Sequence, residues 1–306
     1  SSFRKLFNYI SGSNEKNQEI KMTAPVTQIE KNGNMTMQFY LPSEFDENNT
    51  PSPSNSEVKV LNMKVNTAMI LAGGKGTRFK EQTQTVPKPM IKANGKPLLL
   101  YIIEHYMKFG VENYIVLSGY KSENIVDYFA NVSRQVSKSK FVYNDFANIH
   151  VLYTGLNSMT GWRVKQGIKE VNENEFFLTY GDGISNIDIS KLYKFHKKNN
   201  TLSTVTAVRP PARFGSLKIE NNLVKEFGEK NQADQGWING GFFVINKKID
   251  KYLKHDKKEI FERNPLENLA KKNQLSAYYH EGYWQPVDTI RELEILENYL
   301  KKQNDG

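Results

Sequence analysis

The feature that most constrains the fold is an alternation of short apolar runs with amphipathic stretches, which begins at Thr67. The apolar runs have the length of buried strands and cover 67–74, 113–120, 176–183, 203–208 and 240–246. The amphipathic stretches have helical spacing and cover 97–110, 123–132 and 289–302. This alternation predicts an α/β fold, a Rossmann-like domain with a mixed, mainly parallel sheet. Ligands of such sheets bind at the carboxyl ends of the strands.

The composition limits the functions that the chain can have. Its 306 residues include no cysteine, which excludes disulfides and cysteine-ligated zinc. The chain has no run of about 18 apolar residues and no signal-peptide pattern at its start, so we expect a cytoplasmic protein without a membrane partner. The net charge of +9 comes from lysines scattered along helical faces, which is typical of a solvated surface rather than of a nucleic-acid partner.

A glycine-rich turn follows the first apolar run directly, and residues 71–78 are called the glycine loop below. Glycines let backbone N–H groups approach a phosphate closely, and the guanidinium of Arg78 suits a phosphate. The loop matches neither the Walker pattern nor the dinucleotide-binding fingerprint. Taken alone, it fits a phosphate site and a tight strand–loop connection equally well.

Lys88 stands between Pro87 and Pro89, ten residues after Arg78. The prolines hold the backbone extended and stiff, which would aim one ammonium group at a fixed point, although a surface turn is the simpler interpretation of this stretch alone. Together, the glycine loop and the P-K-P stretch resemble the signature of the sugar-nucleotide pyrophosphorylase family. Further runs narrow the resemblance to its glucose-1-phosphate cytidylyltransferase branch over about residues 66–300, and they lie at 158–161, 180–183, 210–215, 239–243 and 284–289.

The resemblance implies a role for each matching residue. The residues expected to bind the nucleotide are Leu71, Ala72, Gly73, Gly74, Lys75, Gly76, Thr77, Ser158, Thr160, Arg163 and Gly181. The residues expected to be catalytic are Arg78 and Lys88. The residues expected to bind the sugar phosphate are Glu229, Lys230, Asn239 and Gly240. The expected ligands of Mg²⁺ are Asp182 and Asp288.

The implied reaction transfers a cytidylyl group from CTP to glucose 1-phosphate and gives CDP-glucose and pyrophosphate, in an enzyme that forms a homo-oligomer. Two carboxylates suffice for Mg²⁺, because this ion keeps several waters and substrate phosphates as ligands. The sugar phosphate is already an anionic nucleophile at neutral pH, so the reaction needs no general base. Arg78, Lys88 and the metal would offset the charge that develops on the leaving pyrophosphate.

Several residues leave alternatives open. Asp182 also fits an ordinary Gly-Asp-Gly turn, and Asp288 also fits the N-cap of the last helix. Trp162 replaces a glycine of the family pattern beside the expected base pocket. We interpret 140–153 as a shortened loop that covers the base or makes oligomer contacts. The alternative substrates are dTTP with glucose 1-phosphate, or GTP with a heptose 1-phosphate.

The first 65 residues differ from the rest, so we divide the chain into domains 1–65 and 66–306. Residues 1–65 resemble the middle of the SOUL heme-binding family, including its M-T-A-P-V motif at 22–26, but cover only part of such a domain. We expect an incomplete α+β segment that buries too little apolar surface to fold alone. A heme- or tetrapyrrole-binding module is the alternative function of another class, although no histidine precedes His105.

Overall fold

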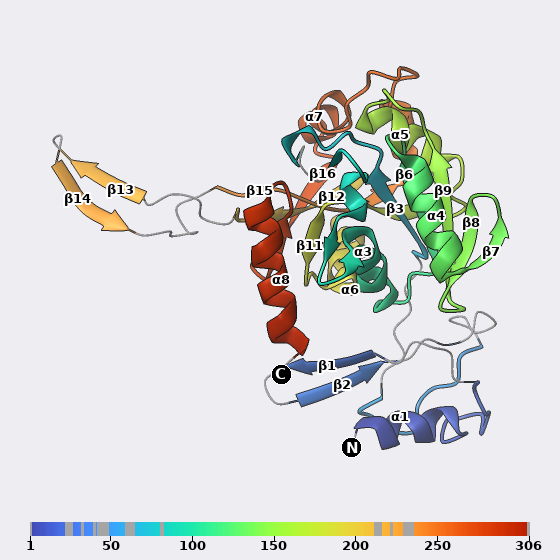
Figure 1. Ribbon diagram of the computed structural model, residues 1–306. Helices are drawn as coiled ribbons and strands as arrows, with labels where there is room; N and C mark the ends of the chain where they lie inside the picture. Colours follow the sequence, from blue (N-terminus) through green and yellow to red (C-terminus); the bar gives the residue numbers. More distant parts are fainter. Residues whose placement is uncertain are drawn as a thin grey trace.

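In the computed structural model, the described residues are 2–21, 27–31, 34–38, 41, 49–58, 65–79, 83–210, 216–220, 223–228 and 236–304. Their largest unit is a nine-stranded sheet with helices on both faces (Figure 1). In spatial order its strands are β16 (Leu275–His280), β12 (Ser203–Val208), β15 (Ile238–Asn246), β10 (Glu175–Tyr180), β3 (Thr67–Ala72), β6 (Asn113–Ser118), β9 (Ala147–Tyr153), β8 (Lys140–Tyr143) and β7 (Arg134–Ser137).

Most strands of this sheet run in one direction. β3 is parallel to β6 and β10, β6 is parallel to β9, and β12 is parallel to β16. β15 lies between β10 and β12 and is antiparallel to both, while β8 is antiparallel to β7 and β9. The predicted α/β fold with a mixed, mainly parallel sheet is confirmed. An apolar run indicates a strand but not its direction, so the reversal of β15 is a finding of the structure.

Helices cover both faces of the sheet, which explains why β3 is apolar from Ala68 to Ala72. Ala68 and Ile70 pack into one core, whereas Met69 and Leu71 pack into the other, because successive side chains of a strand point to opposite faces. The first core includes side chains of α3 (Leu98–Met107), α4 (Ser122–Val132), α6 (Ile189–Asn199) and α8 (Ile290–Asn304). The second includes side chains of α5 (Thr160–Ile168), the 3₁₀ helix η4 (Lys247–Tyr252) and α7 (Asn264–Lys271).

The expectation of a loop at 140–153 is wrong, because β8 and β9 occupy most of this segment. Ala147, Ile149 and Val151 are buried at alternate positions of β9, which is a strand pattern that the sequence contains. β9 pairs with β6 through six of its seven residues, from Asn148 to Tyr153. The segment therefore belongs to the sheet.

Short elements connect the sheet to the site. Two 3₁₀ helices, η1 (Thr77–Phe79) and η2 (Lys88–Met90), follow β3. Three further pairs of short antiparallel strands are β4 (Lys92–Ala93) with β5 (Lys96–Pro97), β11 (Gly183–Ser185) with β17 (Trp284–Pro286), and β13 (Ser216–Glu220) with β14 (Leu223–Gly228). Across the described residues, no helix has the length and apolar character needed to cross a membrane.

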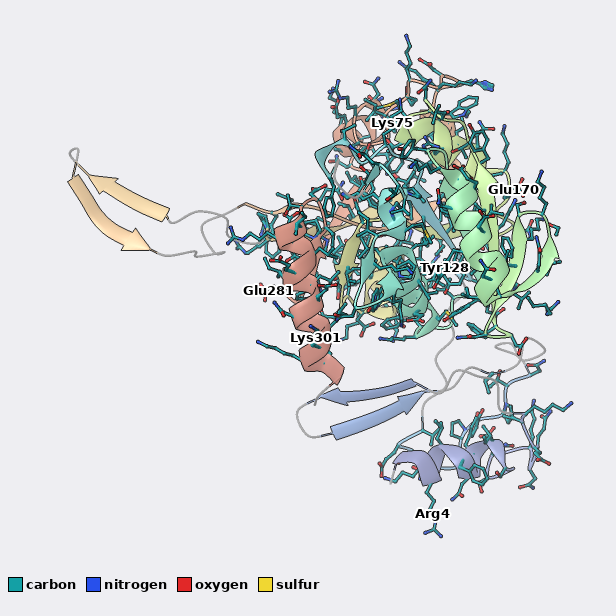
Figure 2. The ribbon with its side chains drawn as sticks, in the orientation of Figure 1. Arg4, Lys75, Tyr128, Glu170, Glu281 and Lys301 are labelled. Carbon is teal, nitrogen blue, oxygen red and sulfur yellow. The ribbon has the colours of Figure 1, made fainter. Side chains whose placement is uncertain are left out.

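The N-terminal segment contains helix α1 (Ser2–Ile10) and an antiparallel pair of strands, β1 (Thr27–Lys31) and β2 (Asn34–Gln38). The Tyr9 hydroxyl donates to the Pro51 carbonyl at 2.8 Å, and Tyr9 packs in a small cluster with Ile10 and Ile20. Residues 22–26, which carry the M-T-A-P-V motif, lie outside the described residues. Figure 2 shows Arg4 of α1 and Lys75 of the glycine loop at opposite ends of the molecule.

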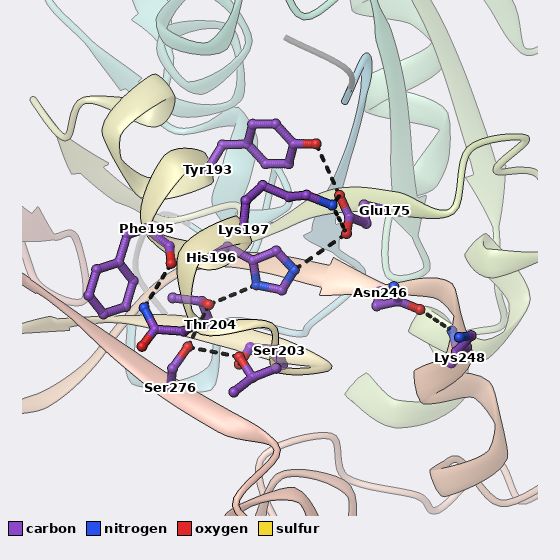
Figure 3. Close-up of polar contacts among 12 residues, drawn as sticks. Glu175, Tyr193, Phe195, His196, Lys197, Ser203, Thr204, Asn246, Lys248 and Ser276 are labelled. Atoms are coloured by element: carbon purple, nitrogen blue, oxygen red, sulfur yellow. Dashed lines mark hydrogen bonds and ion pairs between the residues drawn. The ribbon is translucent and has the colours of Figure 1, made fainter.

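A polar network fixes helix α6 to the amino ends of neighbouring strands (Figure 3). Glu175, the first residue of β10, accepts hydrogen bonds from the Tyr193 hydroxyl at 3.0 Å and from Lys197 Nζ at 2.9 Å. His196 Nδ1 lies 2.8 Å from Thr204 Oγ1 of β12. Burial lowers the pKa of His196, although the charge of Glu175 opposes this shift. These hydrogen bonds hold α6 at the amino edge of the sheet.

Candidate active site

Most of the predicted site residues that the structure describes meet at the edge of the sheet where β3 and β10 end. The glycine loop leaves β3 at this edge, and Gly181 and Asp182 follow β10. β15 runs in the opposite direction, so the residues at its start, Asn239 and Gly240, reach the same edge. If β15 were parallel to β10, Asn239 and Gly240 would lie at the opposite edge of the sheet.

The glycine loop is held from one side and open on the other. Gly76 has a φ of +61°, a left-handed conformation that favours glycine, and Thr83 Oγ1 donates to its carbonyl at 3.1 Å. A side chain at Gly74 would meet no described atom within 4 Å. Lys75 beside it is exposed. The open stretch at 74–75 is where a phosphate can approach the backbone.

The buried side chain of Arg163 supports the glycine loop. Its guanidinium donates to the Ser118 carbonyl at 2.7 Å, to Thr154 Oγ1 at 2.6 Å and to the Gly73 carbonyl at 3.0 Å. A side chain at Gly73 would overlap this guanidinium. Arg163 is 3% exposed, and burial lowers its pKa to about 10, so it stays charged at neutral pH. The structure thus places Arg163 behind the loop rather than on its open side.

Lys88 lies between the two predicted metal ligands. Its Nζ is 2.6 Å from Asp182 Oδ2 and 2.6 Å from Asp288 Oδ1. Burial lowers the pKa of Lys88, but the two carboxylates outweigh burial, so the pKa lies above its ordinary value. The ammonium group is therefore charged at neutral pH.

The short sheet of β11 and β17 brings the two aspartates together. Asp182 precedes β11 and Asp288 follows β17, and the Val287 N–H donates to the Asp182 carbonyl at 2.9 Å. Gly181 allows the approach of the P-K-P stretch, because a Cβ on it would lie 2.8 Å from Pro89 Cγ. Three segments that are far apart in sequence therefore converge on Lys88.

Thr289 and Glu292 cap the start of α8, next to Asp288. Thr289 Oγ1 accepts from the Glu292 N–H at 3.2 Å, and the Glu292 carboxylate accepts from the Asp288 N–H at 2.8 Å. This reciprocal arrangement satisfies the start of the helix with Thr289 and Glu292. The carboxylate of Asp288 faces Lys88 instead.

The carboxylates of Asp182 and Asp288 suit a hard divalent cation. Both point at one positive charge, the Lys88 ammonium, at the same distance. Among the described residues there is no group of three or more His, Cys, Asp or Glu side chains that could hold a metal alone. Two carboxylates with waters and substrate phosphates are the ligand set that Mg²⁺ prefers. The residues present therefore fit a metal that arrives with a phosphate substrate.

Asn239 and Gly240, which the sequence assigns to the sugar phosphate, lie beside Tyr180. Asn239 Nδ2 donates to the Tyr180 hydroxyl at 3.0 Å, and Asn239 Oδ1 accepts from the Gly241 N–H at 2.9 Å. Trp284 Nε1 donates to the Gly240 carbonyl at 2.8 Å and so links β15 to β17. Glu229, Lys230 and the stretch 211–215 lie outside the described residues.

Ser158 and Thr160, assigned to the nucleotide, lie around the start of α5. Ser158 Oγ donates to the Thr154 carbonyl at 2.7 Å, whereas Thr160 Oγ1 donates to Glu262 Oε2 at 2.6 Å. The ring of Trp162 lies 4.9 Å from that of His255. Of the predicted catalytic pair, Lys88 is described, and for Arg78 the structure describes the backbone in η1 but not the side chain.

A comparison with known protein families identifies the family of this chain. The model of the nucleotidyl transferase family matches residues 67–303. This chain belongs to the nucleotidyl transferase family. Enzymes of this family typically use a divalent metal, which agrees with the carboxylate pair of the transferase site. A second model, that of SOUL heme-binding proteins, matches residues 1–87 and overlaps the start of the transferase match.

The transferase part has similar curated relatives and solved structures. Glucose-1-phosphate cytidylyltransferase of Salmonella typhi is 40% identical over 77% of this chain and 96% of its own length. A probable glucose-1-phosphate cytidylyltransferase of Bacillus subtilis is 38% identical over 74% of this chain and 92% of its own length. The structure of HddC from Yersinia pseudotuberculosis in complex with GMP-PN has 25% identity and a TM-score of 0.58, over 77% of this chain and 100% of that one.

Proposed function

We propose that this nucleotidyl transferase transfers a cytidylyl group from CTP to glucose 1-phosphate and releases pyrophosphate, with Mg²⁺ as the metal. The observation that carries the proposal is the 40% identity to a glucose-1-phosphate cytidylyltransferase over almost the full length of that enzyme. The convergence of Lys88, Asp182 and Asp288 beside an open glycine loop supports the same chemistry.

In the proposed reaction, an oxygen of the sugar phosphate attacks the α-phosphorus of CTP, and pyrophosphate leaves from the opposite side. The backbone at 74–75 binds the triphosphate, and Lys88 and Arg78 offset the negative charge that develops on the leaving group. When bound, Mg²⁺ would be held by Asp182 and Asp288 and would neutralise phosphate charge. Lys88 is charged, and Asp182 and Asp288 hold it in the site.

A pyrophosphate-release assay tests the proposal. The full chain is offered glucose 1-phosphate and Mg²⁺ with CTP, dTTP, UTP or GTP in turn. We expect release to be fastest with CTP. Release with another nucleotide alone would overturn the choice of base, and no release with any pair would overturn the activity.

A different nucleotide is the second candidate within the same class. The similar structure of HddC holds a guanine nucleotide analogue, and Trp162 stands beside the expected base pocket, at the start of α5. The assay therefore includes GTP with a heptose 1-phosphate as one pair. Faster release with this pair than with CTP and glucose 1-phosphate would favour the guanylyl reaction.

We further propose that 1–65 and 66–306 are separate units and that the transferase unit forms a homo-oligomer. The contacts described for α1 join it to neighbouring parts of the same segment, such as Tyr9 to Pro51 and Lys5 to Glu57. The similarity of 1–87 to SOUL heme-binding proteins favours a tetrapyrrole as an alternative ligand. Hemin titration tests this alternative: a Soret band at one equivalent would support it, and its absence would count against it.

A further inference from the structure

Glu262 lies between Thr160, which is expected to bind the nucleotide, and Tyr180, which contacts the expected sugar-phosphate residue Asn239. No role is assigned to Glu262 above. It lies in the connection before α7, and its two carboxylate oxygens bind different partners. Oε2 accepts from Thr160 Oγ1 at 2.6 Å, and Oε1 accepts from the Tyr180 hydroxyl at 2.7 Å. Both bonds are short, as hydrogen bonds to a charged acceptor are.

The partners of Glu262 extend in two directions. Thr160 begins α5 in the stretch assigned to the nucleotide, and its Oγ1 also accepts from the Phe261 N–H at 2.9 Å. Tyr180 ends β10 directly before Gly181 and Asp182, and its hydroxyl accepts from Asn239 Nδ2 at 3.0 Å. The carboxylate of Glu262 therefore links Thr160, expected to bind the nucleotide, through Tyr180 to Asn239, expected to bind the sugar phosphate.

The direction of each hydrogen bond in this network is fixed. The Tyr180 hydroxyl has one proton to donate and lone pairs that accept. Its single proton points at Glu262, which leaves the oxygen to accept from Asn239. The ring also packs closely on the backbone of Gly241, which has a φ of +81°. A Cβ atom at this position would lie only 2.3 Å from Tyr180 Cδ2. Tyr180 therefore cannot turn without breaking both bonds.

We propose that Glu262 is a positioning residue that couples binding of the nucleotide at Thr160 to binding of the sugar phosphate at Asn239. This inference rests on the proposed function, since it assigns the two ends of the network to the two substrates. A carboxylate at this position accepts one hydrogen bond on each of its two oxygens, whereas the amide of glutamine has one acceptor oxygen and one donor nitrogen. Replacement by glutamine leaves the size of the side chain nearly unchanged and removes the acceptor from one of the two bonds.

The test compares Glu262→Gln with Glu267→Gln, the same substitution at an exposed position of α7. The Michaelis constants of CTP and of glucose 1-phosphate are measured by pyrophosphate release with the full chain. We expect both constants to rise about tenfold in Glu262→Gln, with a melting temperature close to wild type, and neither to change in Glu267→Gln. If Glu262→Gln fails to fold, Glu262→Asp replaces it, because the shorter side chain also loses one bond.

Coupling has a signature that a purely structural role would lack. Asn239→Ala, a change on the sugar side, should raise the Michaelis constant of CTP in the wild-type background but not in the Glu262→Gln background. An equal effect of Asn239→Ala in both backgrounds would overturn the coupling, as would a Glu262→Gln variant that behaves like Glu267→Gln. These outcomes require an active wild-type chain. An inactive wild-type chain would overturn the proposed function and the role of Glu262 together.

Discussion

At the scale of single residues, the site is built around the Lys88 ammonium, which lies between two carboxylates from distant parts of the chain. The carboxylates suit a metal, and the ammonium lies between them. In the proposed reaction, Lys88 therefore has two sets of partners: the carboxylates of Asp182 and Asp288, and the phosphates of the substrates.

Replacing Lys88 by methionine separates these roles. We predict that Lys88→Met lowers the rate of pyrophosphate release by about 100-fold or more, because the charge beside the leaving group is lost. We also predict tighter binding of Mn²⁺ to the substrate-free chain, because no ammonium group competes for the two carboxylates. Electron paramagnetic resonance of Mn²⁺ measures this binding. Lys92→Met, at an exposed position nearby, is the control, and equal Mn²⁺ affinities in the two variants would refute the competition.

Arg163 is a second residue whose role the structure sharpens, because it reaches three acceptors under the glycine loop. Lysine keeps the charge but lacks the planar fork, so Arg163→Lys leaves acceptors unpaired. We predict a rise in the Michaelis constant of CTP together with a loss of about 1–3 kcal/mol in the free energy of unfolding. Urea unfolding and the release assay check both. A slower rate with unchanged stability would instead indicate direct contact with the nucleotide.

At the scale of elements, α3 carries a titratable group, His105, whose neutral form is favoured by its burial. His105 Nε2 lies 2.8 Å from the Ile187 carbonyl, which it can only approach as a donor. Burial lowers the pKa of His105 to about 4, with Lys108 adding to the shift. In the unfolded chain the pKa is about 6.5. The unfolded state thus binds a proton between about pH 6.5 and 4 that the folded state does not.

The sign of this linkage gives a pH prediction. The free energy of unfolding should be constant above about pH 6.5 as far as His105 is concerned, and should fall on acidification by at most about 1.4 kcal/mol per pH unit. In His105→Gln the amide can still donate to Ile187 but does not titrate, so the fall should be shallower. Urea unfolding at pH 7, 6 and 5 measures it, and parallel pH curves for the two chains would contradict the assignment.

Elements also show how far the sequence predicts the fold. The apolar runs predict β3, β6, β10, β12 and β15 because burial on both faces leaves a local signature. The sequence interpretation does not include β9, because it assigns 140–153 to a shortened loop. Buried and more exposed residues nevertheless alternate along this strand. The direction of β15 and the pairing of β11 with β17 depend on contacts between distant segments, which no local pattern encodes.

The same distinction applies to the site. Lys88, Asp182 and Asp288 are predictable because each stands in a short motif, and the structure brings them together. Glu262 carries no such signal, since a lone glutamate before a helix resembles any surface residue. Only the fold shows that Thr160 and Tyr180 meet at its carboxylate.

At the scale of the whole molecule, the chain combines a nucleotidyl transferase with a short N-terminal segment. The described cluster in that segment has three buried apolar residues, Tyr9, Ile10 and Ile20, whereas the transferase has two large cores. We predict that a chain comprising residues 66–306 keeps the turnover number of the full chain. Pyrophosphate release by the two chains at equal concentration measures this. A loss of activity on removal of 1–65 would show that the segment supports the enzyme.

The proposed activity is metal-dependent transfer of a cytidylyl group at the site formed by Lys88, Asp182 and Asp288. The most direct measurement is pyrophosphate release from CTP and glucose 1-phosphate by the full chain, beside its Asp182→Asn variant. We predict release that depends on Mg²⁺ in the wild-type chain and a loss of about 100-fold or more in the variant, with a similar melting temperature. Wild-type release by Asp182→Asn, or no release by the wild-type chain, would contradict the claim.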